Sequence, residues 1–287
     1  MSKTQNATTL FRKRLLIWFS QNGRSLPWRT TSDPYAIVVS EIMLQQTQVD
    51  RVIPKYYAWL KAFPNWKRLA SASQVRTLKL WNGLGYNRRA LMLQRLAHEV
   101  IKNKDGELPR SAMEMQKLPG IGPYTAQAVG AFAFRLPKSA PVDTNVARII
   151  RRVFGLQSAR LDVIADVASD LVPRDVWTWN HAMMDFGALV CTARQPKCAA
   201  CPMRDTCEAY RLGDFGASKK SQTKFIGSDR MFRGRILQAL HAGPSALKKL
   251  AKEIGLEGDP KRFEKVLNGL AKEGFVECRR NIIYIKD

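Results

Sequence analysis

A mainly α-helical core followed by a small α+β domain is the fold class that this sequence predicts. Through most of residues 8–210, apolar side chains recur with the period of a helix, and Pro or Gly interrupts them at short breaks. After a polar stretch rich in Gly, Ser and Lys, three more helical segments precede two short β-type runs. We therefore predict a helical domain at residues 1–210, a linker at 211–229 and a second domain at 230–287.

The charge balance predicts a polyanionic partner. Lys and Arg number 47 against 24 Asp and Glu, which gives a formal charge of +23 over 287 residues. A globular chain this basic is typical of nucleic-acid binding, and a basic enzyme without such a partner is the weaker alternative. No apolar run is long enough to span a bilayer, and the polar N-terminal residues do not resemble a signal peptide. We therefore expect a cytoplasmic, nucleoid-associated protein with no membrane partner.

The first element with chemical content is a predicted helix at residues 35–44. Asp33 and Pro34 are typical of an N-cap and a first helical position. The helix that follows places Glu41 among strongly apolar residues. Burial would raise the pKa of this carboxyl toward neutrality, as a general acid requires at working pH. The alternative is that Glu41 lies on the exposed stripe of an amphipathic helix.

A glycine-rich turn between two helices predicts a phosphate contact. Residues 118–125 lie between a helix that ends near Lys117 and an apolar helix from Thr125 to Phe134. Gly120 and Gly122 permit a tight turn in which backbone N–H groups at a helix N-terminus face a phosphate. An ordinary helix–helix turn is the alternative.

A second carboxylate opens the next helix. Asp143 and Asn145 begin an amphipathic segment that continues to Phe154. An Asp in this place is most often an N-cap, and that interpretation suffices for Asp143 taken alone.

Four of the five cysteines predict a metal site. Cys191, Cys198, Cys201 and Cys207 fall within seventeen residues, whereas Cys278 lies alone near the end. A disulfide framework would spread its cysteines and would need an oxidising compartment. Four thiolates on a short loop fit either Zn²⁺ or an iron–sulfur cube, and the single central Cys-x2-Cys pair is unusual for zinc.

The C-terminal domain is predicted to be a winged helix. Helical segments at 231–241, 244–254 and 260–272 precede a two-stranded hairpin of residues 275–278 and 282–285. Pro244 and Ser245 are predicted to open the second helix. Such modules bind DNA or protein, so a DNA contact and a protein partner both stay open for this domain.

Several motifs, taken in order along the chain, resemble the MutY-type adenine DNA glycosylases of the endonuclease III superfamily. They are Leu26-Pro27-Trp28-Arg29, residues 40–48, Gly83-Leu84-Gly85-Tyr86, the glycine-rich turn, Val142-Asp143-x-Asn145-Val146, Met183-Met184-Asp185-x-Gly187-Ala188 and the four clustered cysteines. The similarity covers about residues 8–210. It implies a two-lobed helix-hairpin-helix glycosylase core with a [4Fe–4S] cluster on Cys191, Cys198, Cys201 and Cys207. It also implies double-stranded DNA with a mismatch or lesion as the partner.

The resemblance further implies roles for individual residues. Glu41 matches the acid that protonates adenine N7 and then activates water, and Asp143 matches the carboxylate that stabilises the oxocarbenium sugar. Tyr124 and Asn145 match groups that line the same pocket. Positions near the extruded base are matched by Arg24, Leu26, Trp28, Arg29 and Asp185. Residues that contact DNA or enter its base stack are matched by Gln45, Gln46, Tyr86, Gly120 and Gly122.

Other features separate this chain from members of the superfamily. Tyr124 stands where lyase-type members carry the Lys that attacks the sugar, so a monofunctional glycosylase is implied. The common Asp-Gly-Asn is Asp143-Thr144-Asn145 here, Asn87 stands where a second Tyr is common, and no nudix-like domain is expected in the remaining residues. The alternatives are therefore a glycosylase for another base, such as T in G:T, and a non-catalytic iron–sulfur DNA-binding protein. A monomer is expected throughout.

Overall fold

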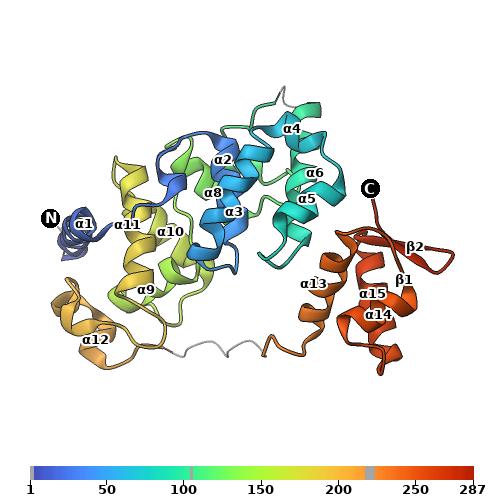
Figure 1. Ribbon diagram of the computed structural model, residues 1–287. Helices are drawn as coiled ribbons and strands as arrows, with labels where there is room; N and C mark the ends of the chain where they lie inside the picture. The colour runs from blue at the N-terminus through green and yellow to red at the C-terminus, as the bar shows by residue number, and fades with distance from the viewer. Residues whose placement is uncertain (1–2, 104–105, 217–223) are drawn as a thin grey trace. The chain divides into compact units, whose positions relative to one another are not determined.

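Helices make up most of the computed structural model, which describes residues 3–103, 106–216 and 224–287 (Figure 1). This confirms the mainly helical fold class. The chain divides into two units, Met1–Glu41 with Leu108–Lys220 and Ile42–Glu107 with Ser221–Asp287. The middle of the predicted linker, residues 217–223, lies outside the described residues, and the domain boundaries at 210 and 229 stay a prediction. Within the described ranges, no helix is both long and apolar enough to cross a membrane.

Several helices of the first unit share an apolar core. Its elements are α1 (Lys3–Asn22), η1 (Pro27–Arg29), α2 (Pro34–Leu44) as far as Glu41, α7 (Ala112–Met115), α8 (Pro123–Phe132), α9 (Thr144–Phe154), α10 (Leu161–Leu171), α11 (Val176–Leu189), η2 (Cys198–Ala200), η3 (Arg204–Thr206) and α12 (Glu208–Leu212). Phe11 of α1 lies edge-on to Phe154 of α9 and Trp179 of α11, with ring centroids 5.4 and 5.8 Å apart. The core therefore joins the first helix to α9 and α11.

Local sequence signals set the ends of the helices that carry the candidate site. Helix α8 begins at Pro123 rather than at the predicted Thr125, because Pro at the first helical position needs no partner for a backbone N–H. Asp143 caps α9, as its position in the sequence suggested, by accepting backbone hydrogen bonds from Asn145 and Val146. The same helix ends at Phe154, and its C-cap Gly155 has a left-handed φ of 70°.

The second unit contains a helical lobe and the C-terminal module. The lobe holds the end of α2 and α3 (Val49–Ala62), α4 (Trp66–Ala70), α5 (Gln74–Trp81) and α6 (Arg88–Asn103). The module holds α13 (Asp229–Leu240), β1 (Ser245–Ala246), α14 (Leu247–Ile254), α15 (Pro260–Lys272), β2 (Val276–Arg279) and β3 (Ile282–Ile285). Within this unit, the Gln74 side chain donates a hydrogen bond to the Gly274 carbonyl, and its backbone N–H donates to the Asp287 carboxylate, each at 2.9 Å.

The wing of the module has one more strand than predicted. The predicted second helix was wrong at its start, because Ser245 pairs with Ile283 and Ala246 with Ile282 in an antiparallel ladder. Helix α14 therefore begins only at Leu247, and the sheet has the order β1-β3-β2. A two-residue strand carries no periodic pattern of its own, so its pairing partner alone identifies it.

Candidate active site

A buried carboxyl and a phenol form the centre of the site. Glu41 is only 5% exposed, so the interpretation of Glu41 as a surface residue is wrong. The Tyr124 hydroxyl, near the start of α8, donates a hydrogen bond of 2.9 Å to Glu41 Oε2. Burial raises the pKa of Glu41 to about 7, although the hydrogen bond from Tyr124 acts in the opposite direction. Near neutral pH, Glu41 therefore exists in both protonation states, as a group that gives and takes a proton must.

The charges around this pair act in opposite directions. Asp143 raises the pKa of Glu41, whereas Arg29 lowers it, and both effects are smaller than that of burial. Burial, with the charges of Glu41 and Asp143, raises the pKa of Tyr124 well above its usual value. Tyr124 therefore keeps its proton and remains a hydrogen-bond donor to Glu41.

Asp143 is held by the N-terminus of α9. Its Oδ1 accepts hydrogen bonds from the backbone N–H groups of Asn145 and Val146 at 2.8 and 2.7 Å. Its Oδ2 accepts one from the Asn145 side-chain amide at 2.9 Å. The helix dipole and three donors thus orient this carboxylate, so Asn145 acts as a partner of Asp143.

Two residues to which the sequence assigned no role hold Asn145 in place. Arg148 Nη2 donates hydrogen bonds of 2.8 Å to Asn145 Oδ1 and to the Gly187 carbonyl, and its Nε donates to the Cys191 carbonyl. A Cβ at Gly187 would lie 2.7 Å from the Asn145 Cβ, so α9 and α11 pack closely only because this position is glycine. The sequence feature that could have indicated this close packing is a glycine inside the apolar helix α11.

An ion-paired cluster lies around Asp185 on α11. This side chain is fully buried and accepts hydrogen bonds of 2.8–2.9 Å from the Arg24 backbone and Nε and from Arg29 Nη1 and Nη2. Four donors fill the acceptor capacity of one carboxylate. Burial acts to raise the pKa of Asp185, but these hydrogen bonds outweigh it and the pKa is lowered. Asp185 therefore fixes the two arginines and has no lone pair left for another ligand.

Apolar residues next to Arg24 and Arg29 complete this region. Leu26 and Trp28 are 7% and 6% exposed, and Pro27–Arg29 forms the short helix η1.

A buried histidine lies on α11, one turn before Asp185. His181 stacks on Phe132, with ring centroids 4.2 Å apart. Burial and Arg29 lower the pKa of His181 well below its usual value, and neither ring nitrogen has a hydrogen-bond partner among the described residues. Sequence patterns gave no indication of this neutral histidine.

The glycine-rich turn leaves open space at the start of α8. Gly120 has a φ of 80°, which other residues rarely adopt, and Gly122 is the N-cap of α8. No atom lies within 4 Å of the position where a Cβ at Gly122 would be. Packing within the protein thus does not require glycine at position 122.

The remaining predicted DNA contacts belong to the second unit. Gln46 is exposed and Tyr86 is 42% exposed, and each has a left-handed φ, of 56° and 46°. Gln45 is partly buried beside Gln46. These three residues lie on two turns, after α2 and before α6.

The cysteine loop gathers four thiols of the first unit. All four are partly buried, and Cys191, Cys201 and Cys207 pack against the apolar core beside α11. Burial raises the pKa of Cys201 to about 11, so a thiolate there needs a positive centre to stabilise it. Among the described residues, no three metal-binding side chains converge as the ligands of a single ion do. The donor set, four cysteines on one short loop, fits an iron–sulfur cube in which each iron takes one thiolate.

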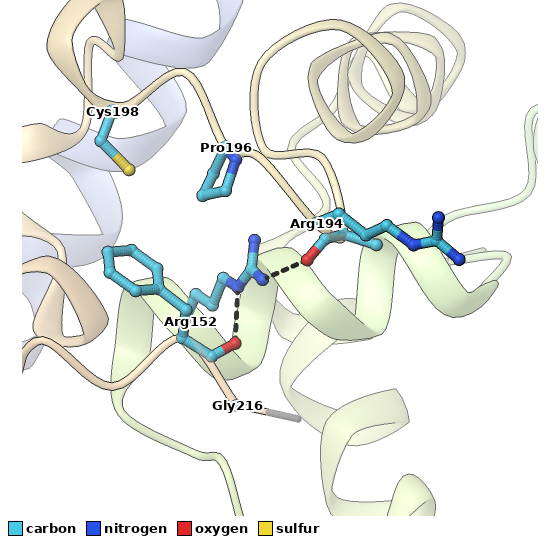
Figure 2. A pocket seen from close by; sticks show the side chains of 7 residues that line it. Arg152, Arg194, Pro196, Cys198 and Gly216 are labelled. Atoms are coloured by element: carbon cyan, nitrogen blue, oxygen red, sulfur yellow. Dashed lines mark hydrogen bonds between the residues drawn. The ribbon is translucent and has the colours of Figure 1, made fainter. Parts of the chain in front are cut away.

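A pocket of about 500 Å³ lies beside this loop (Figure 2). Arg152, Arg194, Pro196, Cys198, Phe215 and Gly216 are among its lining residues. Arg152 donates hydrogen bonds to the carbonyls of Thr192, Ala193 and Phe215 at 2.7–3.0 Å, so it ties the start of the loop to the segment after α12. The residues around Glu41 do not line this pocket.

Two family models match this chain. Residues 39–173 match the HhH-GPD superfamily of base excision DNA repair proteins, and residues 191–207 match the iron–sulfur binding domain of endonuclease III. The fold and these two matches define a class, the iron–sulfur DNA glycosylases of base excision repair.

Individual relatives narrow the class. An adenine DNA glycosylase of Mycolicibacterium smegmatis is 36% identical over 271 residues, which are 92% of this chain and 91% of that protein. The human adenine DNA glycosylase is 40% identical over 223 residues, which are 70% of this chain and 39% of the human protein. The solved structure of a thermostable thymine-DNA glycosylase, 32% identical, superposes with a TM-score of 0.71 over 74% of this chain and all of that one. The chain belongs to the adenine DNA glycosylase family.

Proposed function

We propose that this protein is a monofunctional DNA glycosylase that hydrolyses the N-glycosidic bond of an adenine mispaired with guanine or 8-oxoguanine. The observation that carries the proposal is the buried Glu41, whose pKa is raised to about 7, with Tyr124 hydrogen-bonded to it and Asp143 near enough to perturb it. Non-catalytic DNA binding gives no reason to bury a carboxyl at this cost.

The two carboxyl groups have separate tasks in the reaction. Protonated Glu41 donates its proton to N7 of the extruded adenine, and the bond between the sugar C1′ and N9 breaks with its electron pair leaving on the base. The positive charge left on the sugar is stabilised by Asp143, which its three N–H donors keep in place. The Glu41 carboxylate then takes a proton from the water that adds to C1′. Tyr124 has no amine to form a Schiff base, so the DNA backbone stays intact.

The residues around Glu41 are proposed to form the adenine pocket. Leu26 and Trp28 supply apolar walls, and Arg24 and Arg29, held by Asp185, supply hydrogen-bond donors. Gln45, Gln46 and Tyr86 are proposed to contact the duplex and enter the base stack, because a purine cannot reach a buried acid while it is stacked. Gly120 and Gly122 are proposed to hold a backbone phosphate.

The iron–sulfur cluster is proposed to have a structural role. Cys191, Cys198, Cys201 and Cys207 would hold it, and when bound it supplies the positive centre that keeps the thiolates ionised. The loop in turn positions the Cys191 carbonyl, to which Arg148 donates a hydrogen bond. We propose that the protein acts as a monomer on nucleoid DNA in the cytoplasm, with the C-terminal module adding affinity for DNA or for a protein.

Single-lesion duplexes test this function directly. Purified protein is incubated with duplexes that hold one A opposite 8-oxoguanine, G or T, or one T opposite G, and the products are separated with and without alkali. Strand breaks at A opposite 8-oxoguanine or G that appear only after alkali are expected. Breaks without alkali would contradict the monofunctional mechanism, and no release of adenine would contradict the substrate.

Removal of thymine from G:T is the second candidate. It is favoured by the similarity to a thymine-DNA glycosylase of which this chain covers the whole length. The G:T duplex in the same assay separates the two candidates, because a preference for T over A would support this one.

A further inference from the structure

The two turns that carry Gln46 and Tyr86 are held in an unusual backbone conformation. Both residues have a left-handed φ without being glycine, at 56° and 46°. Such conformations persist only where surrounding interactions over-determine them. The structure should therefore contain a group that holds both turns at once.

That group is the guanidinium of Arg89, the second residue of α6. Its Nη1 donates hydrogen bonds to the backbone carbonyls of Ile42 (2.8 Å), Met43 (3.0 Å) and Gln45. Its Nη2 donates to Thr47 Oγ1 (3.0 Å) and to the carbonyls of Leu84 (3.3 Å) and Gly85 (3.1 Å). The first set belongs to the end of α2 and the turn after it, and the second set links Thr47 of that turn to residues 84–85.

The chemistry of these contacts suits arginine in particular. A planar guanidinium presents five N–H donors in a fixed fork, and its positive charge is favourable at the C-terminal end of a helix. The rings of Trp81 and Tyr86 lie 5.2 and 5.5 Å from it. Burial lowers the pKa of Arg89 to about 10, so the group remains charged at neutral pH. Nearly all of its acceptors are backbone carbonyls, so it fixes the path of the chain on both turns.

We propose that Arg89 is a positioning residue for base extrusion, which keeps Gln46 and Tyr86 in the conformation that enters the base stack. This rests on the proposed function, because it takes these two side chains as the residues that unstack DNA. In this role Arg89 acts through the backbone of the two turns and is not a catalytic residue.

The test compares an adenine in a mispair with an adenine that has no partner base and therefore costs less to extrude. Arg89→Lys keeps the charge but loses the fork, Arg89→Gln loses both, and Arg95→Gln on the exposed face of the same helix is the matched control. Single-turnover excision is measured on adenine mispaired within a duplex and on adenine in a single-base bulge. The Arg89 variants are expected to slow excision from the mispair by roughly 10- to 100-fold, because small misplacements have effects of this size. Excision from the bulge should fall much less, and Arg95→Gln should match the unmodified protein on both.

A fluorescence measurement reports extrusion without chemistry. In a Glu41→Gln background, 2-aminopurine beside the target adenine brightens when that adenine leaves the stack, and the Arg89 variants are expected to lose this signal at saturating protein. An equal loss of excision on both substrates, or an unchanged fluorescence signal, would overturn the inference. If the unmodified protein excised adenine from neither substrate, the proposed function would fail instead.

A milder variant covers the case in which Arg89 replacements do not fold. Thr47→Val removes one acceptor of Nη2 and keeps the shape of the side chain. A selective slowing on the mispair is expected, in the same direction and smaller. Equal rates on both substrates with this variant would also count against the inference.

Discussion

The buried Glu41 lowers the stability of the folded protein near neutral pH and gains the pKa that a general acid needs. Its carboxyl is buried among apolar residues of α2, and burial raises its pKa from the ordinary value of 4.5 to about 7. Because the folded state binds this proton more tightly than the unfolded chain, the carboxyl stabilises the fold least above pH 7. The contribution is present in full below about pH 4.5 and is lost as the pH rises through 7.

Glu41→Gln should therefore abolish activity and raise stability together. Excision should fall by roughly 10²- to 10⁴-fold, because Gln has no proton to give to the leaving base. Duplex binding should stay close to that of the unmodified protein. The free energy of unfolding at pH 8 should rise by up to about 3 kcal/mol, with little difference near pH 4.5. Denaturant titrations at the two pH values measure this, and an equal gain at both would show that Glu41 does not titrate near 7.

Asp185 is expected to stabilise the folded protein, in addition to holding the two arginines of the proposed adenine pocket. Asp185→Asn leaves Arg29, whose side chain is 7% exposed, without a counter-charge, and loss of one partner of a buried pair costs about 3–5 kcal/mol. Thermal or denaturant unfolding should show this loss at pH 7. Asp170→Asn is the control, because its pair with Lys138 is exposed on both sides. Similar effects of the two substitutions would contradict the buried ion pair.

The turn before α8 is proposed to contact a DNA phosphate. Gly122→Ala adds a methyl where no protein atom lies within 4 Å, so thermal stability should not change. Binding to duplex DNA should weaken by about 1.5–3 kcal/mol if the methyl displaces a charged hydrogen-bond acceptor. Gly258→Ala, also in open space, is the matched control for binding and stability. If the Gly122→Ala variant bound duplex DNA with unchanged affinity, the proposed phosphate contact at this turn would be wrong.

The cysteine loop should depend on iron for its structure. Cys201→Ser is expected to remove the broad visible absorption of an iron–sulfur cube and to lower the melting temperature, because Cys201 packs against the core of the first unit. Cys278→Ser should retain both properties, since Cys278 is exposed on β2. Iron and zinc analysis of the three proteins checks this, and stoichiometric zinc without iron would contradict the cluster.

Several basic side chains of the C-terminal module form ion pairs with carboxylates of the same module. Arg262 and Lys265 of α15 pair with Asp229, and Arg279 pairs with Glu277. Lys261 and Lys272 on the same helix are exposed and are better placed to meet a phosphate.

The salt dependence of DNA binding by the whole chain tests whether the exposed lysines, and not the ion-paired residues, contact phosphates. Lys261→Ala and Lys272→Ala should each lower the slope of log affinity against log salt by about 0.9. Arg262→Ala should destabilise the module and leave the slope unchanged. Unchanged slopes for both lysines would mean that the module serves a protein partner.

Much of the molecule was predictable because its signals are local. Asp143 and Pro34 mark helix starts through their own side chains, and the spacing of the clustered cysteines is a property of one short segment. Burial of Glu41 followed from the apolar residues next to it in α2. Such signals act within a few turns of chain, so a sequence displays them directly.

Other features depend on residues that only folding brings together. Arg148 connects Asn145 to Cys191 through hydrogen bonds, and the absence of a side chain at Gly187 leaves space for Asn145. Arg89 holds two turns that lie far apart along the chain. Ser245 joins a sheet through Ile283, and four hydrogen bonds saturate Asp185. No local pattern encodes these contacts, because each depends on the distance and direction between segments that the packed core sets.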